Sequence, residues 1–347
     1  MEYEIAGRKI GAEYPPYIIA EVSANHNGDI DKALNLIEIA KKSGADAVKI
    51  QTYTADTMTL DVDKDNFKIK GGLWDGYTLY KLYQEAHTPW DWHYKLFEKA
   101  RDIGITIFSS PFDESAVDFL EELNTPAYKV ASFEATDIPL ISYMAKKNKP
   151  LIMSTGMANF EEISESVEVI KNSGNKSIAL LHCVSAYPAL ASNYNLKTLI
   201  DLKSKFGVLT GLSDHTLGIA TSVASVALGA CIIEKHFTHD RNDKGPDSEF
   251  SLEPDELKLL CSETKTAWEA IGEVNYKRKG QEESNAVFRR SIYFSQDLKA
   301  GSTITKENIK RIRPGFGLEP KHYEKILGMK VKSDIEKGDP VRWEDLE

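Results

Sequence analysis

The chain has 347 residues, of which 41% are hydrophobic and 28% are charged. This composition is typical of a soluble globular protein and excludes a disordered chain. The formal net charge of −10 argues against a nucleic-acid partner, because binding to a phosphate backbone requires positive charge.

Membrane, secreted and disulfide-rich proteins are excluded by other features. The N-terminal residues contain no apolar segment of the signal-peptide type. The least polar stretch, Gly218–Ile233, is shorter than the roughly 20 residues that a membrane span needs. The cysteines Cys183, Cys231 and Cys261 form no CxxC pair, so neither a disulfide framework nor a thiolate metal site is expected. We expect a cytoplasmic protein with no membrane partner.

Short β-rich segments alternate with helical patterns between residues 17 and 236. The predicted strands are Tyr17–Ala20, Ala47–Gln51, Thr106–Ser109, Ala127–Val130, Pro150–Ser154, Ile178–Cys183, Val208–Leu212 and Cys231–His236. The predicted helices are Asp31–Ser43, Pro89–Ile103 with Thr88 as N-cap, Glu114–Leu123, Ile138–Lys147, Phe160–Ser173, Leu196–Phe206 and Ile219–Leu228. Eight such units predict an α/β fold, a (β/α)₈ TIM barrel. A doubly wound open sheet is the weaker alternative, because no GxGxxG motif follows the first strand.

The last 60 residues differ from the rest in charge. Residues 288–347 carry a net charge of +3, whereas residues 1–287 carry −13. The polar, aperiodic stretch Asn275–Asn285 is typical of a linker. We expect a barrel domain at residues 1–274, a linker at 275–287 and a small domain at 288–347. Similar segments beginning at Asp297 and Asp334 predict a pseudo-symmetric β unit in the small domain.

Each predicted strand has an apolar body and a polar end. Active sites of (β/α)₈ barrels lie at the C-terminal ends of the strands, so we expect these side chains to surround one site. The ring indicates an enzyme. Its members, in chain order, are Glu21, Lys49, Gln51, Ser110, Lys129, Ser132, Ser154, Tyr187, Ser213, His215, Glu234 and His236.

The ring indicates which chemistry the site performs. Two lysines (Lys49, Lys129) and four hydroxyls (Ser110, Ser132, Ser154, Ser213) suit a small anion such as a phosphate ester bearing a carboxylate. Alternatively, the lysines form structural ion pairs with Glu21 or Glu134, or one forms a Schiff base as in an aldolase. His215 and His236 can bind one divalent metal ion. Glu21, Glu234 and Asp247 are candidate acids, bases or acceptors for sugar hydroxyls. The aromatic stretch Trp74–Trp92 serves in packing or as a platform for a sugar.

Several ordered motifs resemble the sialic acid synthase family. They include IIAEVSANHNGD from Ile18, VKIQTYT from Val48, AYKVASFEATD from Ala127, LHCVSAYP from Leu181, GLSDHT from Gly211, IEKHFT from Ile233 and GPD from Gly245. The resemblance covers nearly the whole chain. IKGGLWDGYTLYKLY from Ile69 and TPWDWH from Thr88 resemble the pseudaminic acid synthase branch. No counterpart is seen at Gly71–Tyr77 for the asparagine that helps sialic acid synthases hold N-acetylmannosamine.

The resemblance implies a carbon–carbon bond-forming transferase. Phosphoenolpyruvate, 2,4-diacetamido-2,4,6-trideoxy-L-altrose and water would give a nine-carbon 2-keto-3-deoxy acid, pseudaminic acid, and phosphate. The alternative is an N-acetylneuraminate or legionaminate synthase that uses a different hexosamine. The resemblance implies that His215 and His236 bind a divalent metal ion (Mn²⁺, Co²⁺ or Mg²⁺) and that Glu234 activates the attacking water. It implies that phosphoenolpyruvate binds to Lys49, Ser110, Lys129, Ser132, Ser154 and Ser213. The sugar would bind to Glu21, Gln51, Tyr187 and Asp247.

The C-terminal domain resembles the antifreeze-like SAF domain of this family, with the motif RPGFG at Arg313. The resemblance implies a homodimer with swapped SAF domains, in which Arg313 reaches the sugar bound to the other chain. The plainer alternative is that Arg313 anchors the domain to a barrel surface. A carbohydrate- or ice-binding protein, with the barrel only as a support, would leave the ring of strand ends unexplained.

Overall fold

The computed structural model describes residues 2–71, 75–243 and 245–347. The chain divides into two compact units, residues 1–272 and 273–347, and each is described by itself. The segment predicted as a linker contains the short helix α11 (Gly280–Ser284), followed by a 3₁₀ turn at Asn285–Phe288.

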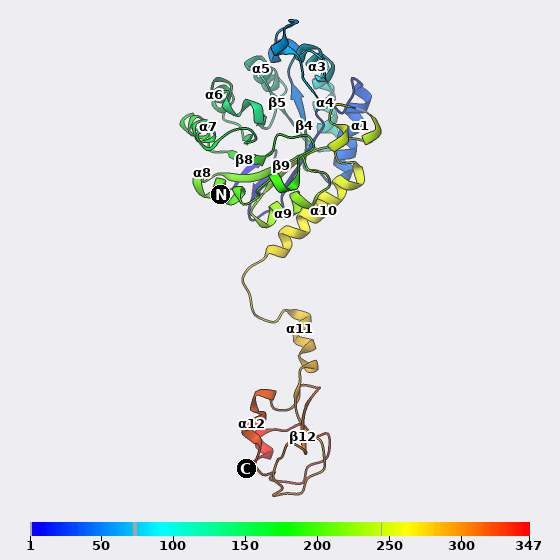
Figure 1. The fold of residues 1–347 in the computed structure, drawn as a ribbon, viewed down its shortest axis with the longest axis vertical. Coiled ribbons are helices and arrows are strands. Elements are labelled where there is room, and N and C mark those ends of the chain that lie inside the picture. Colours follow the sequence, from blue (N-terminus) through cyan, green and yellow to red (C-terminus); the bar gives the residue numbers. More distant parts are fainter. Residues whose placement is uncertain (1, 72–74, 244) are drawn as a thin grey trace. The chain divides into compact units, whose positions relative to one another are not determined.

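The first unit is a closed barrel of eight parallel strands (Figure 1). The strands follow one another around the barrel in chain order, and the last pairs with the first. All eight predicted strands are present, which confirms the predicted TIM-like barrel. Their bounds are β3 (Tyr17–Glu21), β4 (Ala47–Thr52), β5 (Thr106–Pro111), β6 (Tyr128–Val130), β7 (Leu151–Ser154), β8 (Ile178–Cys183), β9 (Leu209–Asp214) and β10 (Ile232–His236).

Helices surround the strands (Figure 1). They are α1 (Ile30–Ser43), α2 (Ala55–Met58), α3 (Leu79–Ala86), α4 (Trp90–Ile103), α5 (Glu114–Glu122), α6 (Ile138–Lys146), α7 (Phe160–Asn172), α8 (Thr198–Phe206), α9 (Ala220–Ala227) and α10 (Pro254–Ile271). The predicted N-cap of α4 was wrong: Pro89 occupies the cap position, while the Thr88 hydroxyl contacts His26 Nε2 at 3.2 Å. Within the described residues, no helix combines the length and apolar character needed to cross a membrane.

The interior of the barrel is layered because alternate residues of a strand point to opposite faces. On β3, Tyr17 and Ile19 belong to an apolar cluster at the N-terminal end, and Glu21 follows at the polar end. A hairpin of β1 (Glu2–Ile5) and β2 (Arg8–Gly11), which the sequence did not predict, adds Ile5 and Ile10 to this cluster. One end of the barrel is therefore filled, and the polar end remains for the site.

The second unit is a small domain with its own apolar core. Strands β11 (Ser291–Phe294) and β12 (Ile309–Ile312) pair antiparallel, and α12 spans Tyr323–Ile326. The predicted internal repeat is visible as a reciprocal contact, in which Leu298 and Ile335 exchange both backbone hydrogen bonds, at 3.0 and 2.8 Å. Asp297 accepts from the Lys337 backbone N–H and Asp334 from that of Ala300.

Candidate active site

The inward side chains at the polar end of the barrel line one cavity of about 490 Å³. Eight of those named below lie on strands, where alternate side chains point inward. The other four, Ser132, Tyr187, His215 and Asp247, lie in segments that follow strand ends. Twelve residues singled out from the sequence line it: Glu21, Lys49, Gln51, Lys129, Ser132, Ser154, Tyr187, Ser213, His215, Glu234, His236 and Asp247. Lys235 lies between two of these on β10 and points elsewhere, pairing with Asp214 at 3.1 Å.

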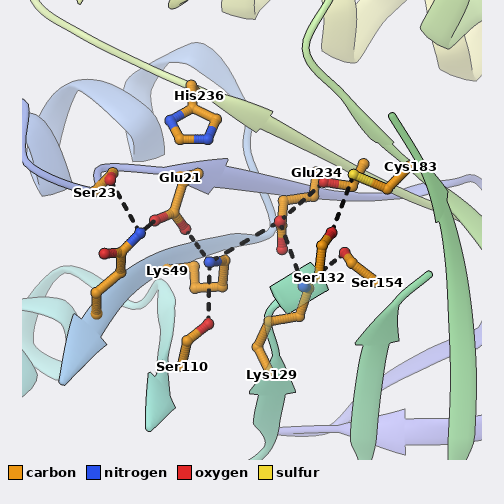
Figure 2. Close-up of polar contacts among 12 residues, drawn as sticks. Glu21, Ser23, Lys49, Ser110, Lys129, Ser132, Ser154, Cys183, Glu234 and His236 are labelled. Carbon is orange, nitrogen blue, oxygen red and sulfur yellow. Dashed lines mark hydrogen bonds and ion pairs between the residues drawn. The ribbon is translucent and has the colours of Figure 1, made fainter. Parts of the chain in front are cut away.

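Lys49 is the buried cation on one side of the cavity. Its Nζ lies 2.5 Å from Glu21 Oε2 and 3.9 Å from Glu234 Oε1, and it donates to Ser110 Oγ at 3.3 Å. Figure 2 shows these contacts converging on the ammonium group. Burial would lower the pKa of Lys49, but the charges of Glu21 and Glu234 outweigh it and raise the pKa. Lys49 is therefore charged, as anion binding requires.

Lys129 is the second buried cation, on the far side of Glu234 (Figure 2). It donates to Ser154 Oγ at 2.7 Å and to its neighbour's carbonyl, Val130 O, at 2.9 Å. Its Nζ lies 3.8 Å from Glu234 Oε1, so Glu234 is shared between two lysines. Burial alone would raise the pKa of Glu234, but Lys129 and Lys49 reverse this and lower it. The same ammonium groups that form ion pairs with glutamates are thus the groups available to bind an anion, so the two interpretations of the lysines do not exclude each other.

Small hydroxyl side chains crowd the wall beside Lys129. Ser132 Oγ donates to Cys183 Sγ at 3.3 Å, and Ser185 Oγ is buried with no hydrogen-bond partner. Gly156 leaves room for both hydroxyls, since a Cβ there would lie 2.4 Å from Ser185 Oγ and 2.8 Å from Ser132 Oγ. Of the serines near Lys129, Ser132 and Ser154 line the cavity and can donate to an anion held by that lysine.

His215 and His236 lie together on the opposite wall, with ring centroids 5.4 Å apart. His215 Nδ1 is 2.9 Å from the Val184 carbonyl; a hydrogen bond of this kind leaves Nε2 as a free ligand. His236 Nδ1 is buried without a hydrogen-bond partner, although Asp247 Oδ2 lies 3.7 Å away. Burial lowers the pKa of His236, which favours the neutral, metal-binding form. Burial would also lower the pKa of His215, but the neighbouring Cys183 outweighs it and raises the pKa. The fit of the two imidazoles to a divalent cation therefore rests on their proximity and on the free Nε2 of His215.

These imidazoles are not a complete metal site by themselves. Among the described residues, no three His, Cys, Asp or Glu side chains are arranged as a metal cage. A cation held by His215 and His236 would take its other ligands from water or substrate, as an open catalytic site does.

The wall near the histidines is aromatic. The ring of Tyr187 lies 4.4 Å from His215 and 5.3 Å from Phe250. Across the cavity, Gln51 donates to Ser23 Oγ at 3.0 Å and to Glu21 Oε1 at 3.4 Å. A tyrosine face with nearby carboxylate and amide groups is suited to the apolar faces and hydroxyls of a sugar.

Two predicted site residues do not line this cavity. Ser110 is fully buried behind Lys49 and contacts it instead. Arg313 belongs to the second unit, where it is exposed and borders a separate surface pocket with Phe288, Arg289 and Arg290. The motif residues 72–74, including Trp74, lie outside the described residues.

Two residues that were not among the predicted site residues lie in the cavity wall or next to it. Glu134 lines it, with a buried Oε2 that has no hydrogen-bond partner. Cys183 approaches His215 Nδ1 at 3.9 Å. Both sit at or just after a strand end, which was the available signal. Glu134 was considered only as a structural ion-pair partner of a lysine, and Cys183 only as a cysteine in an apolar context.

Comparisons with known proteins agree with this geometry. Residues 36–276 match the model of the NeuB family, and residues 289–347 match the SAF domain. The chain belongs to the NeuB family. The matches confirm the family resemblance of the sequence motifs and the SAF resemblance of the C-terminal residues.

Relatives of this NeuB-family chain match over almost their full length. The chain is 47% identical to a pseudaminic acid synthase of Campylobacter jejuni, covering 95% of this chain and 96% of the relative. It is 43% identical to a pseudaminic acid synthase of Helicobacter pylori, covering 96% and 98%. Among solved structures, the chain is similar to an N-acetylneuraminic acid synthetase from Leptospira borgpetersenii in complex with citrate, with a TM-score of 0.74 and 32% identity. The match covers 82% of this chain and 95% of that chain.

Proposed function

We propose that the protein is a pseudaminic acid synthase, a transferase that condenses phosphoenolpyruvate with 2,4-diacetamido-2,4,6-trideoxy-L-altrose and water. The products are the nine-carbon keto acid and phosphate. The observation that carries the proposal is the pair of buried lysines beside two histidines in one cavity, together with the full-length similarity to pseudaminic acid synthases. Legionaminate and N-acetylneuraminate synthases are the alternatives within the family.

Phosphoenolpyruvate would bind over the two lysines. Its phosphate and carboxylate together carry more negative charge than a single lysine can neutralise, so both Lys49 and Lys129 are needed. The two ammonium groups lie close together, because both contact Glu234 Oε1. Ser132, Ser154 and Ser213 would add neutral hydrogen bonds. Ser110 would act through Lys49, whose position it fixes.

The sugar would lie between the aromatic wall and Gln51. Tyr187 would stack on its carbon chain, and Glu21 and Asp247 would accept hydrogen bonds from its hydroxyls. His215 and His236 would hold the divalent cation near the aldehyde. Such a cation, when bound, supplies Lewis-acid polarisation of a carbonyl oxygen, and manganese, cobalt and magnesium are the expected choices.

Glu234 is the proposed base for the water that attacks C2 of phosphoenolpyruvate. Its Oε1 is directed to Ser213 at 3.3 Å and to the two lysines. Its Oε2 is buried without a hydrogen-bond partner, and a buried carboxylate oxygen left unpaired is costly. That oxygen can orient a water and take its proton, while the lysines keep the carboxylate ionised before the reaction.

The active form would be a homodimer in which the SAF domain of one chain supplies Arg313 to the sugar site of the other. The positive net charge of residues 288–347 and the negative charge of residues 1–287 support attraction between such surfaces. A cytoplasmic location remains part of the proposal.

The experiment that tests this function is a panel of hexosamines incubated with phosphoenolpyruvate and Mn²⁺, with keto-acid formation as the readout. The altrose derivative should give the highest kcat/KM. A higher value for the legionaminate precursor or for N-acetylmannosamine would transfer the assignment to that branch.

A further inference from the structure

Helix α3 has an apolar face, yet none of its side chains is buried. Leu82, Tyr83 and Ala86 of this helix line the active-site cavity. Residues three and four positions apart share one face of a helix, so the three form a continuous surface. Gln84, on the opposite face, is exposed. The apolar face of α3 therefore borders the cavity rather than the core.

Neighbouring segments extend this surface. Met58, the last residue of α2, and Phe112, directly after β5, also line the cavity. We define the apolar shelf as Met58, Leu82, Tyr83, Ala86 and Phe112. Tyr53, only 3% exposed, supports it: its ring lies 5.8 Å from that of Tyr83 and 5.2 Å from that of Phe112, edge to face in both cases. The shelf is thus fixed to the end of β4 by packing.

The shelf and the charged groups occupy different depths of the cavity. Lys49 and Lys129 lie within β4 and β6, inside the barrel. Phe112 follows the end of β5, and α2 and α3 belong to the segment between β4 and α4, beyond the strand ends. With its aldehyde carbon at phosphoenolpyruvate near the lysines, a sugar would extend its other end, C6, toward the mouth of the cavity, and the shelf forms one side of that cavity.

The chemistry of the shelf favours one kind of substituent there. Of its five side chains, only that of Tyr83 carries a hydroxyl; the others are a thioether, two aliphatic groups and a phenyl ring. A hydroxymethyl group on this surface loses hydrogen bonds to water that the shelf does not replace, whereas a methyl group gains by leaving water. We propose that the apolar shelf selects sugars with a methyl group at C6 over their 6-hydroxy counterparts.

The proposal rests on the proposed function, because it places the aldehyde end of the sugar at the lysines. It assigns Leu82 and Met58 as residues that contact the substrate and determine specificity without taking part in the bond-forming step. It also gives the aromatic stretch that contains Tyr83 a role in holding the sugar.

The test compares two sugars that differ only at C6, 2,4-diacetamido-2,4,6-trideoxy-L-altrose and its 6-hydroxy counterpart, at saturating phosphoenolpyruvate. The unmodified enzyme should prefer the 6-deoxy sugar in kcat/KM by about tenfold or more. In Leu82→Asn, whose amide can donate to and accept from a hydroxyl, the preference should fall by about tenfold. The KM for phosphoenolpyruvate should stay unchanged.

Two further variants keep the test decisive. Met58→Gln nearly preserves side-chain length and should lower the preference even if Leu82→Asn does not fold. Gln84→Ala, on the opposite face of α3, should retain the preference of the unmodified enzyme. If the unmodified enzyme used both sugars equally, or if the preference survived in the folded shelf variants, the shelf proposal would be overturned while the proposed function stood. If it consumed phosphoenolpyruvate with neither sugar, the proposed function would fail, and the shelf proposal with it.

Discussion

Lys49 Nζ lies 2.5 Å from Glu21 Oε2, and the two side chains are 4% and 1% exposed. The two residues face each other in the register between β3 and β4, so the ion pair is built into the barrel rather than formed by flexible surface groups. A lysine held in this way is oriented before an anion arrives. Preorganised charge of this kind lowers the cost of binding.

The first prediction compares how strongly the lysines and Ser154 contribute to binding phosphoenolpyruvate. Lys49→Ala and Lys129→Ala should each raise the KM for phosphoenolpyruvate by about 10- to 100-fold, because each removes a charge-assisted interaction. Ser154→Ala should raise it only about 2- to 10-fold, since a neutral hydrogen bond is weaker. Steady-state kinetics with each substrate varied in turn would measure this. Equal changes in the KM values of sugar and phosphoenolpyruvate would contradict it.

The same lysines separate the proposed reaction from a Schiff-base aldolase. Borohydride reduction in the presence of substrate should leave the mass of the protein unchanged. A covalent adduct at Lys49 or Lys129 in the mass spectrum would support the aldolase mechanism instead.

The second prediction concerns metal binding. His215→Ala and His236→Ala should each abolish Mn²⁺ binding and activity, because each removes half of the protein ligands. Both variants should fold, since residues at strand ends are not part of the apolar core. Bound Mn²⁺ can be counted by electron paramagnetic resonance after gel filtration. His239 is exposed and lies three residues beyond His236, so His239→Ala is the matched control. Full Mn²⁺ binding by a variant that carries both His215→Ala and His236→Ala would refute the assignment.

The third prediction is a loss of stability in mild acid. Burial lowers the pKa values of His26 and His93 to about 4, whereas an unfolded histidine titrates near 6.5. Below about pH 6.5 the unfolded chain binds protons that the folded chain does not, so each histidine should lower the free energy of unfolding by up to about 1.4 kcal/mol per pH unit until about pH 4.

Urea unfolding at pH 7, 6 and 5 would measure this slope. In His93→Gln the free energy of unfolding should fall less steeply as the pH is lowered, because Gln does not titrate. If the variant and the unmodified protein showed the same pH dependence, His93 would be protonated in the folded state and the prediction would be wrong. His93 is fully buried, and this burial is the cause of its lowered pKa.

The barrel was predictable from the sequence because each strand is a short apolar run that ends in polar residues. The contacts inside it were not. Glu234 on β10 contacts Lys129 on β6. These two strands lie across the barrel from each other, so only closure of the barrel brings the side chains together. The hairpin Glu2–Gly11 was missed because its alternation of polar and apolar residues is short. The shelf depends on how α2 and α3 fold over the cavity, which residue spacing does not encode.

The fourth prediction concerns the SAF domain. Arg313→Ala and His236→Ala should each be inactive alone, but a mixture should recover activity after subunit exchange. In a swapped heterodimer, one site contains both substitutions and the other contains neither, so up to about half of the sites in each heterodimer should work. Activity after mixing and native mass spectrometry of the heterodimer would be followed together. A verified heterodimer without activity would show that Arg313 acts in its own chain or not at all.

The most direct test of the proposed condensation is phosphate release from phosphoenolpyruvate in H₂¹⁸O, with and without the altrose derivative. Attack of water at C2 followed by loss of phosphate breaks the C–O bond, so the bridging oxygen leaves with phosphorus. Phosphate should therefore appear only with the sugar, in equal amount to the nine-carbon keto acid, and should contain no ¹⁸O from the solvent. Phosphate that forms without sugar, or that carries solvent ¹⁸O, would indicate hydrolysis at phosphorus and contradict the proposed reaction.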